Sequence, residues 1–233
     1  MRNSILTPLQ RKVLTSFFQN DLGKSGYYLT GGTALAEFYL HHRYSDDLDF
    51  FTRKQGPLNQ DFDRFINLID TIGLTISSKM MSGEYLKLFV RQKTSDNEDL
   101  KIEFARDVPA QMAPSSDYGG IVVDSYEDIA VNKICAILGR QPSESKDFCD
   151  LYFILKDSNF TLDYLIGRAR GKEAALDTED GILSFTANLM AVRNLQIMPR
   201  MIKPISLEDL EAYLYPLAIE LAQRFRPKGT GHA

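Results

Sequence analysis

The spacing of apolar residues changes once along this chain, near residue 125, and the change limits the folds available to it. Before that point, segments with a helical period alternate with short runs rich in β-branched and aromatic residues, such as YYLT, DLDFFT and YLKLFVRQ. After it, nearly every segment has the helical period. We therefore predict an α+β chain with a mixed-sheet domain over residues 1–125 and a helical domain over residues 126–233.

The same pattern predicts where the individual elements lie. Strands are expected over residues 26–30, 47–52, 74–80, 85–92, 99–107 and 120–125. Helices are expected over residues 6–22, 33–40, 58–73, 125–140, 143–156, 161–170, 178–193 and 206–225. Several of the later helices begin with Ser, Thr or Asp followed three residues on by an acid, the arrangement of a capping box.

Composition and cysteine content exclude several classes of protein. A net charge of -4 over 233 residues, of which 44% are hydrophobic, argues against a disordered chain and against a uniformly basic surface for nucleic acid. Cys135 and Cys149 lie on apolar faces of expected helices, which favours buried thiols over a disulfide. No segment approaches the roughly 20 apolar residues of a membrane span, and the N-terminal segment lacks a signal-peptide core. We expect a cytoplasmic protein with no membrane partner.

Two adjacent glycines, Gly31 and Gly32, separate the first expected strand from the helix that follows it. A turn of this kind leaves backbone N–H groups free to face an anion, and a Cβ atom would hold a phosphate away from them. The turn is therefore a candidate phosphate site. The alternative is a glycine pair that only reverses the chain direction.

Two aspartates share one face of the next expected strand. Because side chains alternate along a strand, Asp47 and Asp49 point away from the side that Leu48 and Phe50 bury. Carboxylates two residues apart lie about 7 Å from each other at Cα, close enough to hold one or two divalent cations. Oxygen ligands without nearby Cys or His favour Mg²⁺ or Mn²⁺. The alternative is an acidic strand that protects a sheet edge from aggregation.

A third carboxylate is offered by the segment LKIEFA. Leu100, Ile102 and Phe104 alternate with Lys101 and Glu103, so Glu103 is expected on the polar face of its strand. There it would serve as a metal ligand or a general base. A solvated strand glutamate is the alternative.

Two cations share a face of the helix expected over residues 125–140. Lys133 and Arg140 are seven residues apart, and the face they form suits a triphosphate or an ordinary solvated surface equally.

Two acids follow in the next expected helix. Asp147 and Asp150 are three residues apart and therefore adjacent on the helix surface. They are candidate catalytic groups. The alternative for Asp147 is an acid in the first turn after a Ser143 or Ser145 cap, where it stabilises the helix by about 0.3 to 1 kcal/mol through the macrodipole.

Together these motifs resemble the AbiEii/AbiGii toxin family of nucleotidyltransferases within the polymerase-β-like superfamily. The resemblance rests on GGTAL followed by R-x-S-x-D-L-D-F, and on K-x-x-A-x-x-x-R followed by K-D-x-x-D-L-Y, all within residues 27–155. It implies a polymerase-β-like mixed sheet flanked by helices, followed by an all-helical C-terminal domain that completes the active site and binds the acceptor.

The resemblance also implies roles for the motif residues. Asp47 and Asp49 are the metal ligands, to which Glu103 is added only by its position on a strand. Lys133 contacts phosphates, and Asp147 is the later catalytic acid. The expected nucleotide-binding set contains both glycines, Thr33 as the hydroxyl donor where relatives carry Ser, and the remaining motif residues: Gly31, Gly32, Thr33, Arg43, Ser45, Lys133, Arg140, Lys146 and Asp150.

The function implied is metal-dependent transfer of NMP from an NTP to an acceptor hydroxyl, with RNA, at the 3′ end of tRNA, as the acceptor. The protein would be the toxin of a toxin–antitoxin or phage-defence system and would have a cognate antitoxin. An RNA groove or an ordinary surface would be formed by the basic residues of the C-terminal part: Arg168, Arg170, Lys172, Arg193, Arg200, Lys203, Arg224, Arg226 and Lys228. Three alternatives stay open: transfer to an aminoglycoside-like small molecule, transfer to a protein hydroxyl, and a non-catalytic scaffold that binds a nucleotide or an antitoxin.

Overall fold

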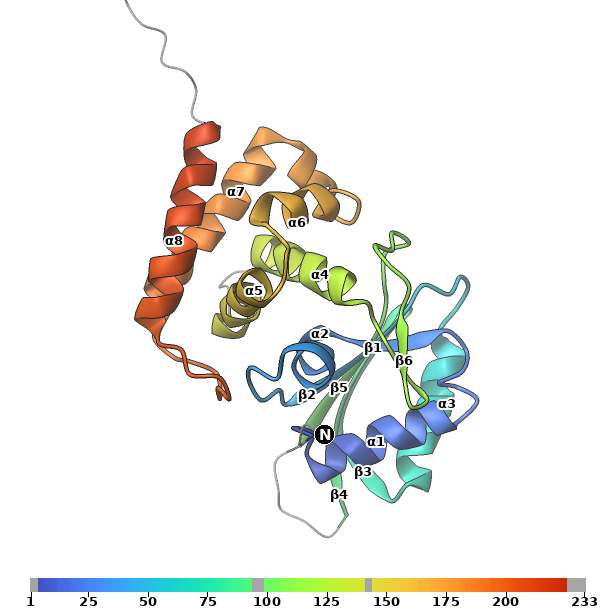
Figure 1. Cartoon of the computed structure of the whole chain (residues 1–233). Coiled ribbons are helices and arrows are strands. Elements are labelled where there is room, and N and C mark those ends of the chain that lie inside the picture. Colours follow the sequence, from blue (N-terminus) through green and yellow to red (C-terminus); the bar gives the residue numbers. More distant parts are fainter. Residues whose placement is uncertain (1–3, 94–98, 141–143, 226–233) are drawn as a thin grey trace, which may run out of the picture. The chain divides into compact units, whose positions relative to one another are not determined.

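The computed structural model describes residues 4–93, 99–140 and 144–225. These residues fall into two compact units, the first ending at Ile129 and the second beginning at Ala130 (Figure 1). The division lies inside α4 (Tyr126–Gly139). The assignment of residues 1–125 and 126–233 as functional domains stays a prediction.

The first unit is built on a mixed sheet, which has seven strands in the described residues, in the order β3-β4-β5-β2-β1-β7-β6. Two neighbouring pairs are parallel, β2 with β5 and β1 with β7, and the other neighbours are antiparallel. The strands are β1 (Tyr27–Thr30), β2 (Asp47–Thr52), β3 (Leu74–Ser82), β4 (Tyr85–Gln92), β5 (Leu100–Arg106), β6 (Ser116–Tyr118) and β7 (Ile121–Val123). The predicted mixed sheet is confirmed.

An aromatic core covers the apolar face of this sheet. Phe50 of β2 and Phe104 of β5 stack with ring centroids 4.9 Å apart. Phe17 of α1 (Pro8–Gln19) lies 4.4 Å from Phe50, and Phe65 of α3 (Asn59–Thr71) lies 4.1 Å from Phe104. The two helices therefore bury alternate residues of β2 and β5.

The first helix is tied to the loop before β2. Thr7 and Gln10 form a capping box at the start of α1, which satisfies two backbone N–H groups of the helix terminus. The buried Gln10 side chain also donates from Nε2 to the carbonyl oxygen of Ser45 at 2.7 Å. Helix α1 thus fixes the position of the backbone directly before β2.

The second unit is helical over its described residues, and the predicted helical C-terminal part is confirmed (Figure 1). After the last part of α4 it contains α5 (Ser145–Asp157), α6 (Leu162–Ala169), η2 (Ala174–Asp177), α7 (Glu179–Met190), η3 (Ala191–Asn194) and α8 (Leu207–Arg224). Thr161, Thr178 and Ser206 cap α6, α7 and α8 with their hydroxyl oxygens. Among the described helices, none combines the length and the apolar character needed to span a bilayer.

Some local predictions are wrong or only partly confirmed. β6 was not predicted, because its three residues are all exposed and carry no apolar alternation. Helix α5 begins at Ser145 with Glu144 as its N-cap and no side-chain capping bond, so Ser145 is not the cap; Ser143 lies outside the described residues. Cys149 is buried, as expected, whereas Cys135 is only half-buried.

We expect Phe104→Ala to lower the free energy of unfolding of the first unit by about 3 to 5 kcal/mol, because it removes a fully buried ring from the aromatic core. Urea unfolding followed by tyrosine fluorescence would measure the loss. Val108→Ala, at a side chain that is 40% exposed, is the matched control and should change it by less than about 0.5 kcal/mol. Equal losses for the two variants would contradict the aromatic core as the source of stability.

Candidate functional site

The polar face of the sheet brings the predicted carboxylates onto neighbouring strands. In the parallel register of β2 and β5, Asp47 is opposite Lys101 and Asp49 is opposite Glu103. These four side chains are half-buried, while the residues between them are buried in the core. The predicted alternation of both strands is confirmed. The roles of Asp47, Asp49 and Glu103 in metal binding stay predictions.

The glycine turn approaches this face from the end of β1. Gly31 begins α2 (Gly31–Ala34) with a φ of 73°, a left-handed conformation that glycine adopts without strain. A Cβ atom at Gly31 would lie 2.2 Å from Oδ2 of Asp49, and one at Gly32 would lie 2.5 Å from Nη2 of Arg43. A Cβ atom at either glycine would therefore force a side chain of the second motif to shift. Their predicted contact with a phosphate stays a prediction.

Two other motif residues hold the segment that connects the glycines to β2, which contains the π-helix η1 (Leu35–Leu40). Thr33 is 1% exposed, and its hydroxyl donates to the carbonyl oxygen of Asp47 at 2.5 Å. Arg43 is 2% exposed and donates from Nη1 to the carbonyl oxygen of Tyr44 at 2.9 Å. The structure thus gives both residues a positioning role. Their contacts with the nucleotide, and that of the half-buried Ser45, stay predictions.

Lysines neutralise the carboxylates on this face. Lys101 Nζ lies 2.7 Å from Asp47 Oδ2 and 3.5 Å from Glu103 Oε2, and Lys87 Nζ lies 3.3 Å from Glu103 Oε1. The Tyr85 hydroxyl donates to the same Glu103 oxygen at 2.5 Å. Lys87, Lys101 and Tyr85 were missed as site residues. The alternation of LKIEFA places Lys101 on the polar face, but its partner depends on which strand lies beside β5.

The carboxylates and ammonium groups of this cluster stabilise each other's charged forms. Burial of Glu103 opposes its ionisation, but the Tyr85 hydroxyl and the ammonium groups of Lys101 and Lys87 outweigh burial and hold the pKa of Glu103 below its usual value. Burial likewise opposes the charge on Lys101, but Asp47 and then Glu103 raise the pKa of Lys101 above its usual value. Glu103 and Lys101 are therefore both charged near neutral pH.

The donor set on this face fits a magnesium-type cation. Asp47 and Asp49 offer oxygen atoms only, and the Asp47 side chain is 26% exposed and so reachable from solvent. In the parts of the chain that the structure describes, no three His, Cys, Asp or Glu side chains converge closely enough to enclose a metal. A hard cation bound by one or two carboxylates usually completes its shell with water and substrate phosphates, which suits this arrangement.

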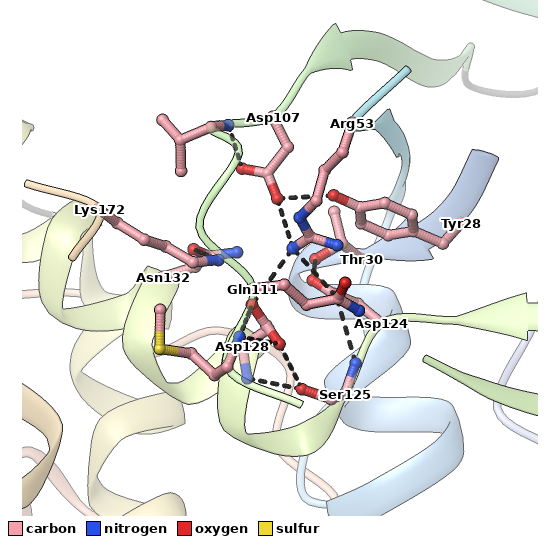
Figure 2. Close-up of polar contacts among 12 residues, drawn as sticks. Tyr28, Thr30, Arg53, Asp107, Gln111, Asp124, Ser125, Asp128, Asn132 and Lys172 are labelled. Carbon is pink, nitrogen blue, oxygen red and sulfur yellow. Dashed lines mark hydrogen bonds and ion pairs between the residues drawn. The ribbon is translucent and has the colours of Figure 1, made fainter. Parts of the chain in front are cut away.

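An arginine network, missed by sequence reasoning, supports the same face beyond β2 (Figure 2). Arg53 Nη2 lies 2.7 Å from Oδ2 of Asp107 and 3.2 Å from Oδ1 of Asp128. Its guanidinium carbon lies 4.6 Å from the centroid of the Tyr28 ring, and the Tyr28 hydroxyl donates to Asp107 at 2.6 Å. Arg53 is separated from these acids by long stretches of sequence, so no local spacing marks the contact.

The network also fixes the strand that carries the glycine turn. Thr30, directly before Gly31, donates from its hydroxyl to Oδ2 of the buried Asp124 at 2.9 Å (Figure 2). In the antiparallel pairing of β1 and β2, Thr30 is opposite Asp49. The hydrogen bond of Thr30 thus fixes β1 at the position that lies opposite Asp49 of β2.

In the second unit, the predicted cation and acids of the later motifs form a buried ion cluster. Lys133 Nζ lies 2.9 Å from Asp147 Oδ1 and 2.7 Å from Asp150 Oδ2, and all three residues are buried. Arg140 Nη1 lies 2.7 Å from the other oxygen of Asp147. The expectation that Lys133 and Arg140 share a helix face is confirmed, because both reach Asp147. Their phosphate contacts and the catalytic role of Asp147 stay predictions.

The other basic residues of this unit are largely paired with acids. Lys146 lies 2.8 Å from Glu144, Arg193 lies 2.9 Å from Glu211, Lys203 lies 2.5 Å from Asp157, Arg224 lies 2.8 Å from Asp163, and Arg170 lies 3.8 Å from Asp177. These pairs reduce the positive charge available to RNA. Two residues of the predicted RNA groove, Arg226 and Lys228, lie outside the described residues. The groove stays a prediction.

We expect Lys133→Met to lower the free energy of unfolding by about 3 to 5 kcal/mol, because it leaves two buried carboxylates without their ammonium partner. Lys146→Met is the control, since that side chain is 32% exposed and its ion pair contributes less than about 1 kcal/mol. Urea unfolding of both variants near neutral pH measures the difference. A loss for Lys133→Met no larger than that of the control would show that the buried cluster does not stabilise the unit.

Comparison with known proteins agrees with this architecture. A candidate nucleotidyltransferase from H. pylori superposes with a TM-score of 0.58 at 19% identity, covering 93% of each chain. MenT4, a nucleotidyltransferase toxin from Mycobacterium tuberculosis, superposes with a TM-score of 0.57 at 16% identity, covering 92% of this chain and 85% of its own. At these identities the likeness shows a shared fold, and the predicted mixed sheet with flanking helices, as found in nucleotidyltransferases, is confirmed.

Sequence comparison assigns the family. The uncharacterised Aquifex aeolicus protein aq_aa25 is 29% identical over 162 residues, which are 65% of this chain and 68% of that protein. The model of the family described as nucleotidyl transferase AbiEii toxin, type IV toxin–antitoxin system, matches residues 12–220. Because this match spans both units, the chain belongs to the AbiEii family of nucleotidyltransferase toxins.

Proposed function

We propose that this nucleotidyltransferase moves NMP from an NTP, bound with Mg²⁺ or Mn²⁺, to a hydroxyl at the 3′ end of tRNA. It would act as the toxin of a toxin–antitoxin or phage-defence system and be held inactive by a cognate antitoxin. The observation that carries the proposal is the convergence of two motifs on one sheet face. The carboxylates of Asp47 and Asp49 lie there, and the missing Cβ of Gly31 leaves room for Asp49 beside the turn.

In this mechanism, Asp47 and Asp49 would hold two divalent cations through their carboxylate oxygens. A pair of such cations supplies positive charge that stabilises the attacking and leaving oxygens of an in-line displacement. The turn at Gly31 and Gly32 binds the triphosphate through backbone N–H groups that have no partner within the helix. The acceptor hydroxyl attacks the α-phosphorus, the bond to the bridging oxygen breaks, and pyrophosphate leaves.

The remaining motif residues complete the proposal. Glu103 serves as the base for the acceptor proton, or as a third oxygen ligand once it moves closer to Asp47 and Asp49 than it lies among the described residues, and its lowered pKa keeps it ionised for either role. Lys133, Arg140 and Lys146 supply positive charge for the triphosphate, and Asp147 is the later acid, as the family resemblance implies. Thr33 and Arg43 act by holding the loop that joins the two motifs.

A second candidate is transfer to a small-molecule or protein hydroxyl. It is favoured by the ion pairs of Arg193, Lys203 and Arg224, which reduce the positive charge that the second unit offers to RNA. A non-catalytic binding scaffold is disfavoured, since a protein that only binds a partner needs no carboxylate pair beside a glycine turn.

The decisive experiment incubates the purified chain with Mg²⁺ and each α-³²P-labelled NTP, with total tRNA, with aminoglycosides or with neither. We expect label in tRNA, and Asp47→Asn should lower the rate at least about 100-fold because a ligand of the cation is lost. Asp46→Asn, at an exposed neighbour that precedes β2, is the matched control and should keep its activity.

The acceptor that takes up label distinguishes the candidates. Label in an aminoglycoside or in protein, with none in tRNA, would replace the RNA acceptor by the second candidate. No label in any acceptor, from a preparation that binds NTP, would refute the catalytic proposal and leave a scaffold. Equal activity of Asp47→Asn and Asp46→Asn would refute the role of Asp47.

Gly31→Ala tests the close approach of the turn to Asp49. Gly73 is the matched control, because its φ of 76° equals that of Gly31 within a few degrees but a Cβ there meets nothing within 4 Å. Both alanine variants should lose about 1 to 2 kcal/mol of stability from left-handed strain. Only Gly31→Ala should lower nucleotide transfer, by at least about tenfold, because its Cβ displaces the carboxylate of Asp49. Equal transfer rates for the two variants would rule out the steric requirement.

A further inference from the structure

Lys101 places a positive charge among the proposed metal ligands. Its ammonium lies between Asp47, at 2.7 Å, and Glu103, at 3.5 Å. A cation that binds these carboxylates would be repelled by a positive charge so close to it. Lys101 and a divalent cation therefore compete for the same oxygen of Asp47.

The strand register determines which carboxylates lie beside Lys101. It is directly opposite Asp47 in the parallel pairing of β2 and β5, and two residues before Glu103 on the same face of its own strand. Its side chain is 25% exposed, so the pair is screened less than a surface ion pair and remains within reach of solvent and ligand.

We propose that Lys101 is an internal cation that occupies Asp47 in the nucleotide-free enzyme, so that the divalent cation binds weakly alone and loads together with the nucleotide. The inference rests on the proposed role of Asp47 as a metal ligand. Lys101 is a positioning residue in this scheme, because it acts through Asp47 and forms no bond in the reaction.

Nucleotide binding would favour the divalent cation over Lys101 as the partner of Asp47 in two ways. Its phosphate oxygens complete the coordination of a hard cation, which two carboxylates alone leave mostly hydrated. Its negative charge also attracts the ammonium of Lys101 and frees Asp47. Glu103 keeps its own partners during this exchange, since Lys87 and the Tyr85 hydroxyl contact its other oxygen.

The test measures Mn²⁺ binding to the full chain without nucleotide, by the electron paramagnetic resonance signal of free Mn²⁺. Lys101→Met should bind Mn²⁺ at least about tenfold more tightly than the wild type, because it removes a positive charge that repels the cation and competes with it for Asp47. Lys101→Arg keeps the charge and should stay near the wild-type affinity. Lys87→Met is the matched control, since Lys87 contacts Glu103, and should change the affinity much less.

A double variant shows whether the gain acts through Asp47. Asp47→Asn combined with Lys101→Met should abolish the tighter binding, because the released ligand is gone. Lys101→Gln repeats the measurement with a polar side chain in case the methionine variant does not fold. An affinity of Lys101→Met and Lys101→Gln equal to that of the wild type, or equal gains for Lys101→Met and Lys87→Met, would overturn the inference.

The two proposals fail in different ways. If the wild type transfers label in the assay above, and Asp47→Asn does not, the proposed function stands whatever the Mn²⁺ titration of Lys101→Met shows. If no variant binds Mn²⁺ in a manner that depends on Asp47, the inference is overturned together with the metal role of Asp47.

Discussion

The parallel pairing of β2 with β5 is the constraint on which both the core and the site depend. Side chains alternate along both strands, so the hydrogen-bond register that stacks Phe50 on Phe104 also sets Asp49 beside Glu103. A slip of one residue would bury the carboxylates and expose the rings. The large cost of that exchange fixes the register, and the aromatic core thereby fixes the position of the charged groups on the opposite face.

The glycine turn adds a second constraint to this register. Thr33 donates to the backbone of Asp47, and the turn passes so close to Asp49 that only glycine fits at position 31. Thr30 is held in turn by Asp124, within the network that Arg53 forms at the far end of β2. These hydrogen bonds join the two motifs in the folded chain.

Local periodicity carried most of the fold prediction, and the failures occur where the information is not local. The alternation in DLDFF and LKIEF was enough to assign Asp47, Asp49 and Glu103 to polar faces, and helical periods located the C-terminal helices. Neither pattern indicates which strands are neighbours in the sheet, so the pairing of Lys101 with Asp47 could not be predicted from the sequence. The Arg53 network joins positions up to 94 residues apart, and the exposed strand β6 lacks any apolar signal.

Each unit pairs a lysine with two acids, and burial decides what each cluster can do. The side chain of Lys133 is 9% exposed and its two aspartates are almost fully buried, so breaking that cluster leaves charges without solvent and is strongly unfavourable. The side chains of Lys101 and Asp47 are 25% and 26% exposed, so water or a ligand can replace one partner at a much smaller cost. The same chemistry therefore gives a permanent support between α4 and α5 and an exchangeable ion pair on the sheet. An exchangeable pair lets Lys101 balance the negative charge of Asp47 while no nucleotide is bound. The same pair can then give way when a cation and a polyphosphate bind.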